Sequence, residues 1–237
     1  MAILRTRRYR SALLRHKVAA GVEHERVLNG LGCRSVVDVG ANRGQFSLVA
    51  RRCFPEATII AFEPLSGPAE RFRRVFAGDP HVSLHQHALG PQNTMSTMHV
   101  SSKDDSSSLL PITSRQSSIY PGTGESSTST VRVRRLVDCL RAGELKPPVM
   151  LKLDVQGYEL EALTGCEELL DSFSYVYAEG SFVELYQGQV LADDLIDWLR
   201  RHRYRLSGVY GVNYDEQGRA VQADMLFRKA LSDRGKK

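Results

Sequence analysis

The chain has 237 residues, of which 42% are hydrophobic and 25% are charged, and its formal net charge is +5. A chain of this length can bury one sizeable core, and no apolar run approaches the ~18 residues that span a bilayer. The four cysteines are scattered and include no C-x-x-C pair, which argues against a disulfide framework or a cysteine zinc site. Because the N-terminus lacks the apolar core of a secretory signal, we expect a cytoplasmic protein.

The positive charge is concentrated at the N-terminus. Residues 1–20 carry five arginines, one lysine and no acid, so the remainder of the chain is close to neutral and slightly acidic. We therefore expect a basic arm and a short helix over residues 1–30. A weak leucine stripe suits peripheral contact of this arm with an anionic membrane surface, and a solvated helix or a frayed terminus explains the same pattern.

Apolar runs alternate with amphipathic segments through the rest of the chain. Runs typical of strands are, in chain order, 36–39, 57–62, 81–89, 94–100, 131–133, 149–154, 175–179, 204–210 and 221–227. Helical patterns cover 22–31, 46–50 and 69–76, begin at 136 and at 157, and cover 191–201. A hairpin-like turn at 215–218 makes the last strand antiparallel. This order predicts an α/β, Rossmann-like fold with a seven-stranded, mostly parallel sheet and helices on both faces. We expect one domain over residues 31–230, followed by a polar tail at 231–237.

Residues 101–130 differ from this pattern in composition. Serines dominate the segment, with Pro121, Gly122 and Gly124 as breakers of regular structure. Such a composition is typical of a disordered surface loop, whereas a long insertion inside a compact domain is often an active-site lid. A loop that is mobile when empty and ordered when substrate binds satisfies both interpretations.

The most informative segment is residues 36–47, where a strand ends in an acid and a glycine turn leads into a helix. Gly40 and Gly44 lack the G-x-G-x-x-G spacing of dinucleotide folds, and no P-loop lysine follows. Gly40 permits a sharp turn with positive φ, and Gly44 permits close approach of backbone and ligand. An acidic glycine turn without phosphate-binding groups suits S-adenosylmethionine, whose sulfonium and ammonium are cationic. Asp38 is expected to fix the loop or to meet that ammonium.

A second acid, Glu63, ends the next strand. At this spacing a carboxylate accepts hydrogen bonds from the ribose hydroxyls of a nucleoside ligand, and a surface turn is the alternative. Ligands of open α/β sheets bind beyond the carboxyl ends of the strands. We therefore expect further cofactor contacts from Asn42, Gln45 and Phe46 along the methionine and adenosine, and from His87 and Ala88 at the adenine.

Asp154 ends the strand expected beside the glycine loop, and we place it at the reaction centre. Methyl transfer to an aliphatic hydroxyl requires an aligned acceptor and removal of its proton. Glu179 ends the neighbouring strand and Lys152 shares a face with Asp154. All three are therefore candidate catalytic residues, with a structural ion pair as the alternative for Lys152 and Glu179. Together with Asp224 on the last strand, the two acids act either as base and orienter or as ligands of Mg²⁺.

With these residues in place, the chain resembles the FkbM family of S-adenosylmethionine-dependent methyltransferases over residues 34–229. The resemblance rests on V-D-V-G-A-N-R-G at 37–44, F-E-P at 62–64, A-L-G at 88–90, L-K-L-D-V-Q-G-Y-E at 151–159 and E-L-Y-Q-G-Q at 184–189. It implies the class I methyltransferase fold and transfer of a methyl group to a hydroxyl, commonly of a sugar or a secondary metabolite. Many members carry glutamate at the position of Gln156, which argues against an essential acid there. Leu136-Val137-Asp138 likewise replaces the more usual Thr-Leu-Asp.

The expected activity is O-methylation of a carbohydrate hydroxyl on an oligosaccharide, a polysaccharide precursor or a glycolipid. An RNA ribose or polyketide O-methyltransferase is one alternative, although the slightly acidic body of the chain disfavours a nucleic-acid partner. A second alternative is a noncatalytic partner protein that binds S-adenosylmethionine and docks to a membrane. The strand-end acids of this chain argue against that alternative, since all four are intact: Asp38, Glu63, Asp154 and Glu179. The acceptor hydroxyl, the metal dependence and the oligomeric state stay open, with a homodimer as the usual state of soluble enzymes.

Overall fold

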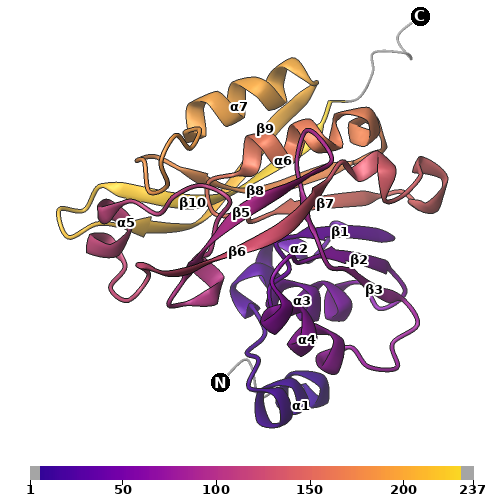
Figure 1. Cartoon of the computed structure of the whole chain (residues 1–237). Helices are drawn as coiled ribbons and strands as arrows, with labels where there is room; N and C mark the ends of the chain where they lie inside the picture. Colours follow the sequence, from indigo (N-terminus) through magenta and orange to yellow (C-terminus); the bar gives the residue numbers. More distant parts are fainter. Residues whose placement is uncertain (1–5, 231–237) are drawn as a thin grey trace, which may run out of the picture.

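A computed structural model describes residues 6–230 (Figure 1). Its main sheet has seven strands in the order β3-β2-β1-β7-β8-β10-β9. The first five run parallel, and β10 runs antiparallel to both of its neighbours. The predicted seven-stranded, mostly parallel sheet with an antiparallel last strand is confirmed. The strands are β1 Ser35–Val39, β2 Thr58–Phe62, β3 Val82–His85, β7 Val149–Leu153, β8 Tyr175–Ser181, β9 Tyr204–Tyr214 and β10 Ala220–Lys229.

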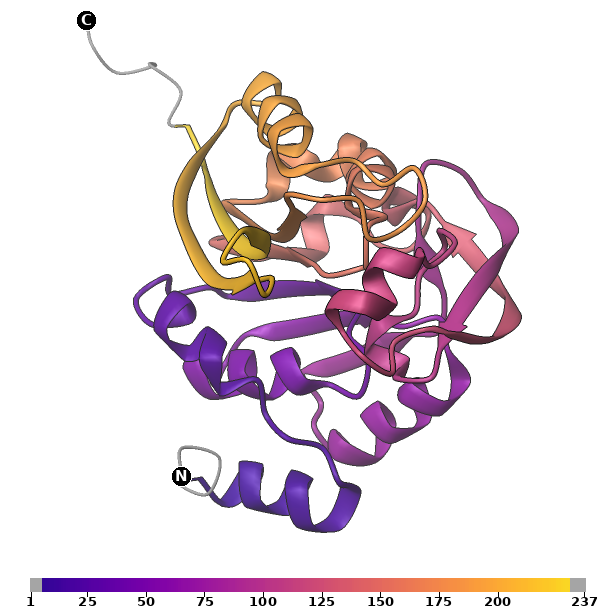
Figure 2. The same cartoon turned by 90° about the vertical axis from the view of Figure 1, so that its left-hand side faces the viewer.

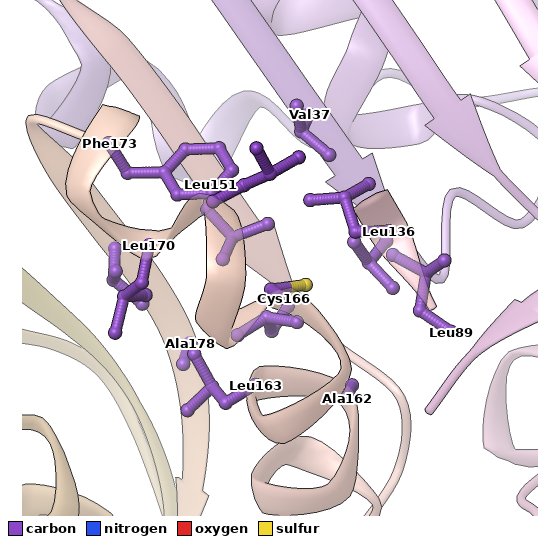
Figure 3. Close-up of a cluster of buried hydrophobic side chains, with 14 of the residues drawn as sticks. Val37, Leu89, Leu136, Leu151, Ala162, Leu163, Cys166, Leu170, Phe173 and Ala178 are labelled. Carbon is purple, nitrogen blue, oxygen red and sulfur yellow. The ribbon is translucent and has the colours of Figure 1, made fainter. Parts of the chain in front are cut away.

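Helices cover both faces of this sheet (Figure 1). Side chains of successive strand residues point to opposite faces, so Val36 packs into one core and Val37 into the other. Figure 3 shows the core that contains Val37, which lies between the sheet and α6. The helices are α1 Arg7–His16, α2 Glu25–Leu28, α3 Gln45–Cys53, α4 Ser66–Val75, α5 Ser114–Ile119, α6 Glu159–Cys166 and α7 Ala192–Arg201. The 3-10 turns are η2 Val22–His24, η3 Asp104–Ser106, η4 Leu136–Asp138, η5 Ala142–Glu144 and η6 Glu167–Ser172.

The strand predicted over 81–89 is divided into two, so that prediction is wrong in its extent. After β3 the backbone turns, with the amide of His87 bonded to the carbonyl of His85. Ala88–Leu89 then forms β4, which pairs with β6 Glu125–Arg134 in a second sheet of order β4-β6-β5. The third member, β5 Thr94–Ser101, matches the expected strand. The turn therefore directs the chain out of the main sheet and toward the insertion.

The serine-rich insertion is regularly folded, which corrects its interpretation as a disordered loop. It contains η3, α5 and the first half of β6, and residues 125–130 pair antiparallel with β5. The side chain of Ser101 is buried and donates a hydrogen bond to the carbonyl of Thr123. In Figure 2 the insertion projects in pink beside the main sheet. Pairing with β5 gives the backbone N–H and C=O groups of residues 125–130 hydrogen-bond partners within the protein, whereas in a disordered loop these groups would bond to water.

The described part of the basic arm is a helix docked on the domain. Tyr9 and Ala12 of α1 are buried, and Arg8 pairs with Asp79 while lying over the ring of Phe76. The single helix predicted over 22–31 is instead η2 followed by the short α2. The ends of the predicted arm and tail, residues 1–5 and 231–237, lie outside the described residues. Within residues 6–230 no helix is both long and apolar enough to cross a membrane.

Candidate active site

A cavity of about 230 Å³ opens at the carboxyl ends of β1, β2 and β7. This is the edge at which parallel α/β sheets bind ligands. Of the residues predicted to contact the cofactor, those that line it are Gly40, Asn42, Gln45, Phe46, Glu63 and Ala88. The predicted catalytic residues Asp154 and Lys152 line it as well. The lining does not include Asp38, Gly44, His87 or Glu179.

The two glycines of the loop are required by packing within the protein. Gly40 has φ of 74°, and a Cβ there would overlap the carbonyl oxygen of Asp154, which directly follows the neighbouring strand β7. Gly44 has φ of 93°, and a Cβ there would come within 2.6 Å of the Phe76 ring. The structure thus shows that Gly44 is needed for close contact with Phe76, and the approach of a ligand to Gly44 stays a prediction.

Glu63 joins the glycine loop to the end of β2. Its Oε2 accepts a hydrogen bond of 2.9 Å from the amide of Asn42, and its Oε1 accepts one of 2.8 Å from the amide of Leu65. Burial raises the pKa of this carboxyl to about 7, against the opposing effect of the two amides. Each carboxylate oxygen has a second lone pair. Glu63 is thus a fixed acceptor on the cavity wall, as a ribose-binding acid must be.

Asp38 lies beneath the glycine loop and away from the cavity lining. Its Oδ1 is 3.1 Å from Nζ of Lys152, and its Oδ2 accepts a hydrogen bond of 2.6 Å from the hydroxyl of Ser47. Lys152 also donates to the carbonyl of Gly40 at 3.1 Å. Burial lowers the pKa of Lys152, but the carboxylates of Asp38 and Asp154 outweigh burial and leave it raised. The geometry therefore favours the loop-fixing role for Asp38.

His87 is held in the turn between the two sheets. Its Nε2 lies 3.1 Å from Sγ of Cys139, and its ring meets that of Phe62 edge-on. Burial, with the nearby His85, lowers the pKa of His87 to about 4. The ring is therefore neutral near pH 7. His87 is not among the residues that line the cavity, whereas the next residue, Ala88, is.

Asp154 projects from the end of β7, with 43% of its side chain exposed. Its Oδ1 accepts a hydrogen bond of 2.8 Å from Nε2 of Gln156, and its Oδ2 lies 3.6 Å from Nζ of Lys152. Gln156 is held in turn, because its Oε1 accepts a bond of 2.7 Å from the hydroxyl of Tyr186. Asp154 is thus an oriented carboxylate with a face open to the cavity.

Glu179 is engaged by two amide side chains. Its Oε2 lies 3.3 Å from Nε2 of Gln156 and 2.9 Å from Nε2 of Gln222. Burial, followed by the charge of Asp154, raises the pKa of Glu179 well above its usual range. Asp224 stands opposite Glu179 in the pairing of β8 with β10. Across residues 6–230, however, no three His, Cys, Asp or Glu side chains lie close enough together to hold a metal ion. The arrangement therefore does not support the predicted set of Asp154, Glu179 and Asp224 as Mg²⁺ ligands, since the Gln156 amide bridges the first two.

The insertion forms part of the cavity wall. Asp104, Asp105, Ser107 and Leu109 line the cavity, and Asp104 pairs with Arg43 of the glycine loop, with Nε to Oδ2 at 3.0 Å. Composition alone gave no reason to single out these acids.

His24 was also missed by sequence reasoning. It lines the cavity, and its Nδ1 lies 3.0 Å from the hydroxyl of Tyr177 and 3.6 Å from the carboxylate of Asp224. A single histidine in a short turn carries no motif, so only the fold reveals its position.

A sheet of this strand order, with a glycine loop and strand-end acids around one cavity, defines a class I methyltransferase fold. The family model described as "Methyltransferase FkbM domain" matches residues 38–206. The chain belongs to this FkbM methyltransferase family.

Several curated proteins are similar to this chain. The 2-O-methyltransferase NoeI of Sinorhizobium fredii is 29% identical over 171 residues, which cover 69% of this chain and 70% of NoeI. The hexuronic acid methyltransferase AglP of Haloferax volcanii is 28% identical over 143 residues, which cover 60% of this chain and 54% of AglP. Methyltransferase sdnD of Sordaria araneosa is 29% identical over 56% of this chain and 60% of its own length. Among solved structures, TnmH superposes with a TM-score of 0.47 at 12% identity, over 93% of this chain and 55% of TnmH.

Proposed function

We propose that this methyltransferase uses S-adenosylmethionine and acts on a hydroxyl of a carbohydrate. The observation that carries the proposal is the oriented, half-exposed carboxylate of Asp154 in the same cavity as Glu63. The printed names of two relatives, a 2-O-methyltransferase and a hexuronic acid methyltransferase, support a sugar acceptor.

The cavity suits a cationic methyl donor. Its lining includes five acids, while Lys152 is engaged by Asp38 beneath the loop. The acids are Glu23, Glu63, Asp104, Asp105 and Asp154. Glu63 would hold the ribose hydroxyls, and Phe46 and Ala88 would supply apolar contacts. When bound, S-adenosylmethionine supplies an electrophilic methyl group on its sulfonium.

Asp154 receives the acceptor. Its carboxylate accepts a hydrogen bond from the acceptor and holds the acceptor in position for the displacement, and alignment of this kind contributes strongly to such reactions. Gln156 and Lys152 hold the carboxylate in one rotamer. Glu179 contributes by fixing Gln156.

The first experiment is calorimetric titration with S-adenosylmethionine and, separately, with NAD. We expect micromolar binding of the former alone. Labelled methyl transfer is then measured to methyl glycosides and glycolipids, with and without Mg²⁺, and to RNA dinucleotides and polyketide alcohols in parallel. Transfer to a non-carbohydrate acceptor alone would overturn the carbohydrate assignment, and binding without transfer to any acceptor would favour a noncatalytic protein.

Asp154→Asn provides the matched variant. We expect its turnover to fall at least about 100-fold, with the dissociation constant of S-adenosylmethionine within a small factor of wild type. Turnover at the wild-type rate would remove Asp154 from the reaction centre.

A further inference from the structure

A second polar centre lies on the cavity wall, built from three elements far apart in the sequence. His24 comes from η2, Tyr177 from β8 and Asp224 from β10. His24 lines the cavity. The region matched by the family model, residues 38–206, includes neither His24 nor Asp224. The family comparison therefore gives this cluster no role.

The contacts of His24 define which of its ring nitrogens carries hydrogen. Nδ1 lies 3.0 Å from the Tyr177 hydroxyl and 3.6 Å from the Asp224 carboxylate. An ionised carboxylate only accepts and would repel a bare lone pair at Nδ1, so Nδ1 carries the hydrogen and donates it to the Tyr177 oxygen. Nε2 is consequently the nitrogen with a free lone pair in the neutral ring.

Packing holds the imidazole in place at the cavity wall. The ring meets those of Phe46 and Tyr177 edge-on, at centroid distances of 5.3 and 5.7 Å. The amide of Gly21 donates to the carbonyl of Gln45 at 3.1 Å, which holds η2 against α3. Nε2 is 3.7 Å from the carboxylate of Glu23, another lining residue, which is beyond hydrogen-bonding range.

We propose that His24 is the catalytic base that takes the proton of the acceptor hydroxyl, with Tyr177 and Asp224 as its positioning residues. This inference rests on the proposed function and extends it. Histidine is the side chain that enzymes use most often as a general base. Asp154 then positions the acceptor, and His24 receives the proton of the reacting hydroxyl.

The methyl transfer is an in-line displacement. As the acceptor oxygen forms its bond to the methyl carbon, the bond from that carbon to sulfur breaks and leaves its electron pair on sulfur. The hydroxyl proton moves to Nε2 of His24. The resulting imidazolium is stabilised by Tyr177 and by the carboxylate of Asp224 at Nδ1.

The tautomer of His24 tests this arrangement without any acceptor. In ¹⁵N NMR of the full chain, assigned by difference with His24→Asn, we expect the neutral ring to carry its proton on Nδ1. Tyr177→Phe should shift the ring toward a mixture of tautomers. A wild-type ring protonated on Nε2 would overturn the proposal, whatever the acceptor is.

Rescue by imidazole tests the chemical role. His24→Ala should lower turnover at least about 100-fold while leaving the affinity for S-adenosylmethionine unchanged, and added imidazole should restore part of the rate saturably. His202→Ala, at a histidine that stacks on Trp198, is the matched control and should keep the wild-type rate without a response to imidazole. Turnover of His24→Ala within twofold of wild type would refute the role.

The two proposals fail in different ways. If the wild type methylates no glycoside, the carbohydrate assignment fails, and the His24 series is measured on whichever dinucleotide or polyketide alcohol accepts the methyl group. A wild type that binds S-adenosylmethionine and methylates no hydroxyl would overturn both.

Discussion

The carboxylate of Asp38 and the ammonium of Lys152 lie 3.1 Å apart between two central strands, and both side chains are almost completely buried. The two residues are direct partners in the pairing of β1 with β7. The ammonium also donates to the carbonyl of Gly40. One ion pair therefore joins the strands to the loop that borders the cavity.

Removing one member of this pair leaves the other charge buried without compensation. We expect Lys152→Met to lower the free energy of unfolding by about 3–5 kcal/mol. Lys146→Met, at an exposed lysine, should change it by less than about 0.5 kcal/mol. Urea denaturation of both variants measures the difference, and equal losses would show that the buried pair contributes no more than a surface charge.

A comparison of alanine substitutions at two glycines distinguishes the cost of backbone strain from the cost of steric overlap. Gly40 and Gly188 have φ of 74° and 76°, but a Cβ at Gly188 has no atom within 4 Å. Gly188→Ala should therefore cost about 1 kcal/mol from φ alone. Gly40→Ala also forces apart the loop and the carbonyl of Asp154, so we expect it to cost more than about 4 kcal/mol or to prevent folding. Matched unfolding curves for the two variants would refute this explanation.

The acid at the end of β2 should make cofactor affinity depend on pH. The pKa of Glu63 is raised to about 7, so its carboxyl is mostly protonated at pH 6 and ionised at pH 8. If the ionised form binds the ribose, affinity for S-adenosylmethionine should fall about tenfold from pH 8 to pH 6. Calorimetry of Glu63→Gln should show weaker binding without that fall. Glu216→Gln, at an exposed site, should bind like wild type, and a fall that persists in Glu63→Gln would have another source.

Glu159 should destabilise the fold at alkaline pH. Its Oε1 accepts from the amides of Val155 and Gly157, and burial raises its pKa to about 7. A raised pKa means that the folded state holds the proton more tightly. Its contribution to stability is therefore fully present below the unfolded value near 4.5 and is lost as the pH rises through 7. Between pH 5 and pH 8.5, wild type should lose about 2.5 kcal/mol more unfolding free energy than Glu159→Gln. Parallel pH profiles from urea denaturation would contradict this assignment.

The sequence determined the architecture and the edge at which the chemistry lies. Alternating apolar runs and helical segments specify parallel strands, and the carboxyl ends of parallel strands meet at one edge. The acids Asp38, Glu63 and Asp154 belong to the ends of three such strands, so the pattern of the chain alone predicts that they lie near one another. The glycine loop and the family motifs predicted that the reaction is methyl transfer.

The tertiary structure decided which of these acids face the cavity. Asp38 is neutralised by Lys152 and Glu179 is bonded by two amides, whereas Glu63 and Asp154 keep acceptor capacity at the cavity wall. These differences depend on partners from other strands, which local periodicity does not encode. His24 gains its position from Tyr177 and Asp224, more than 150 residues away. Pairing with β5 orders the insertion. The serine content of the insertion does not reveal this, because strand formation depends on the partner strand.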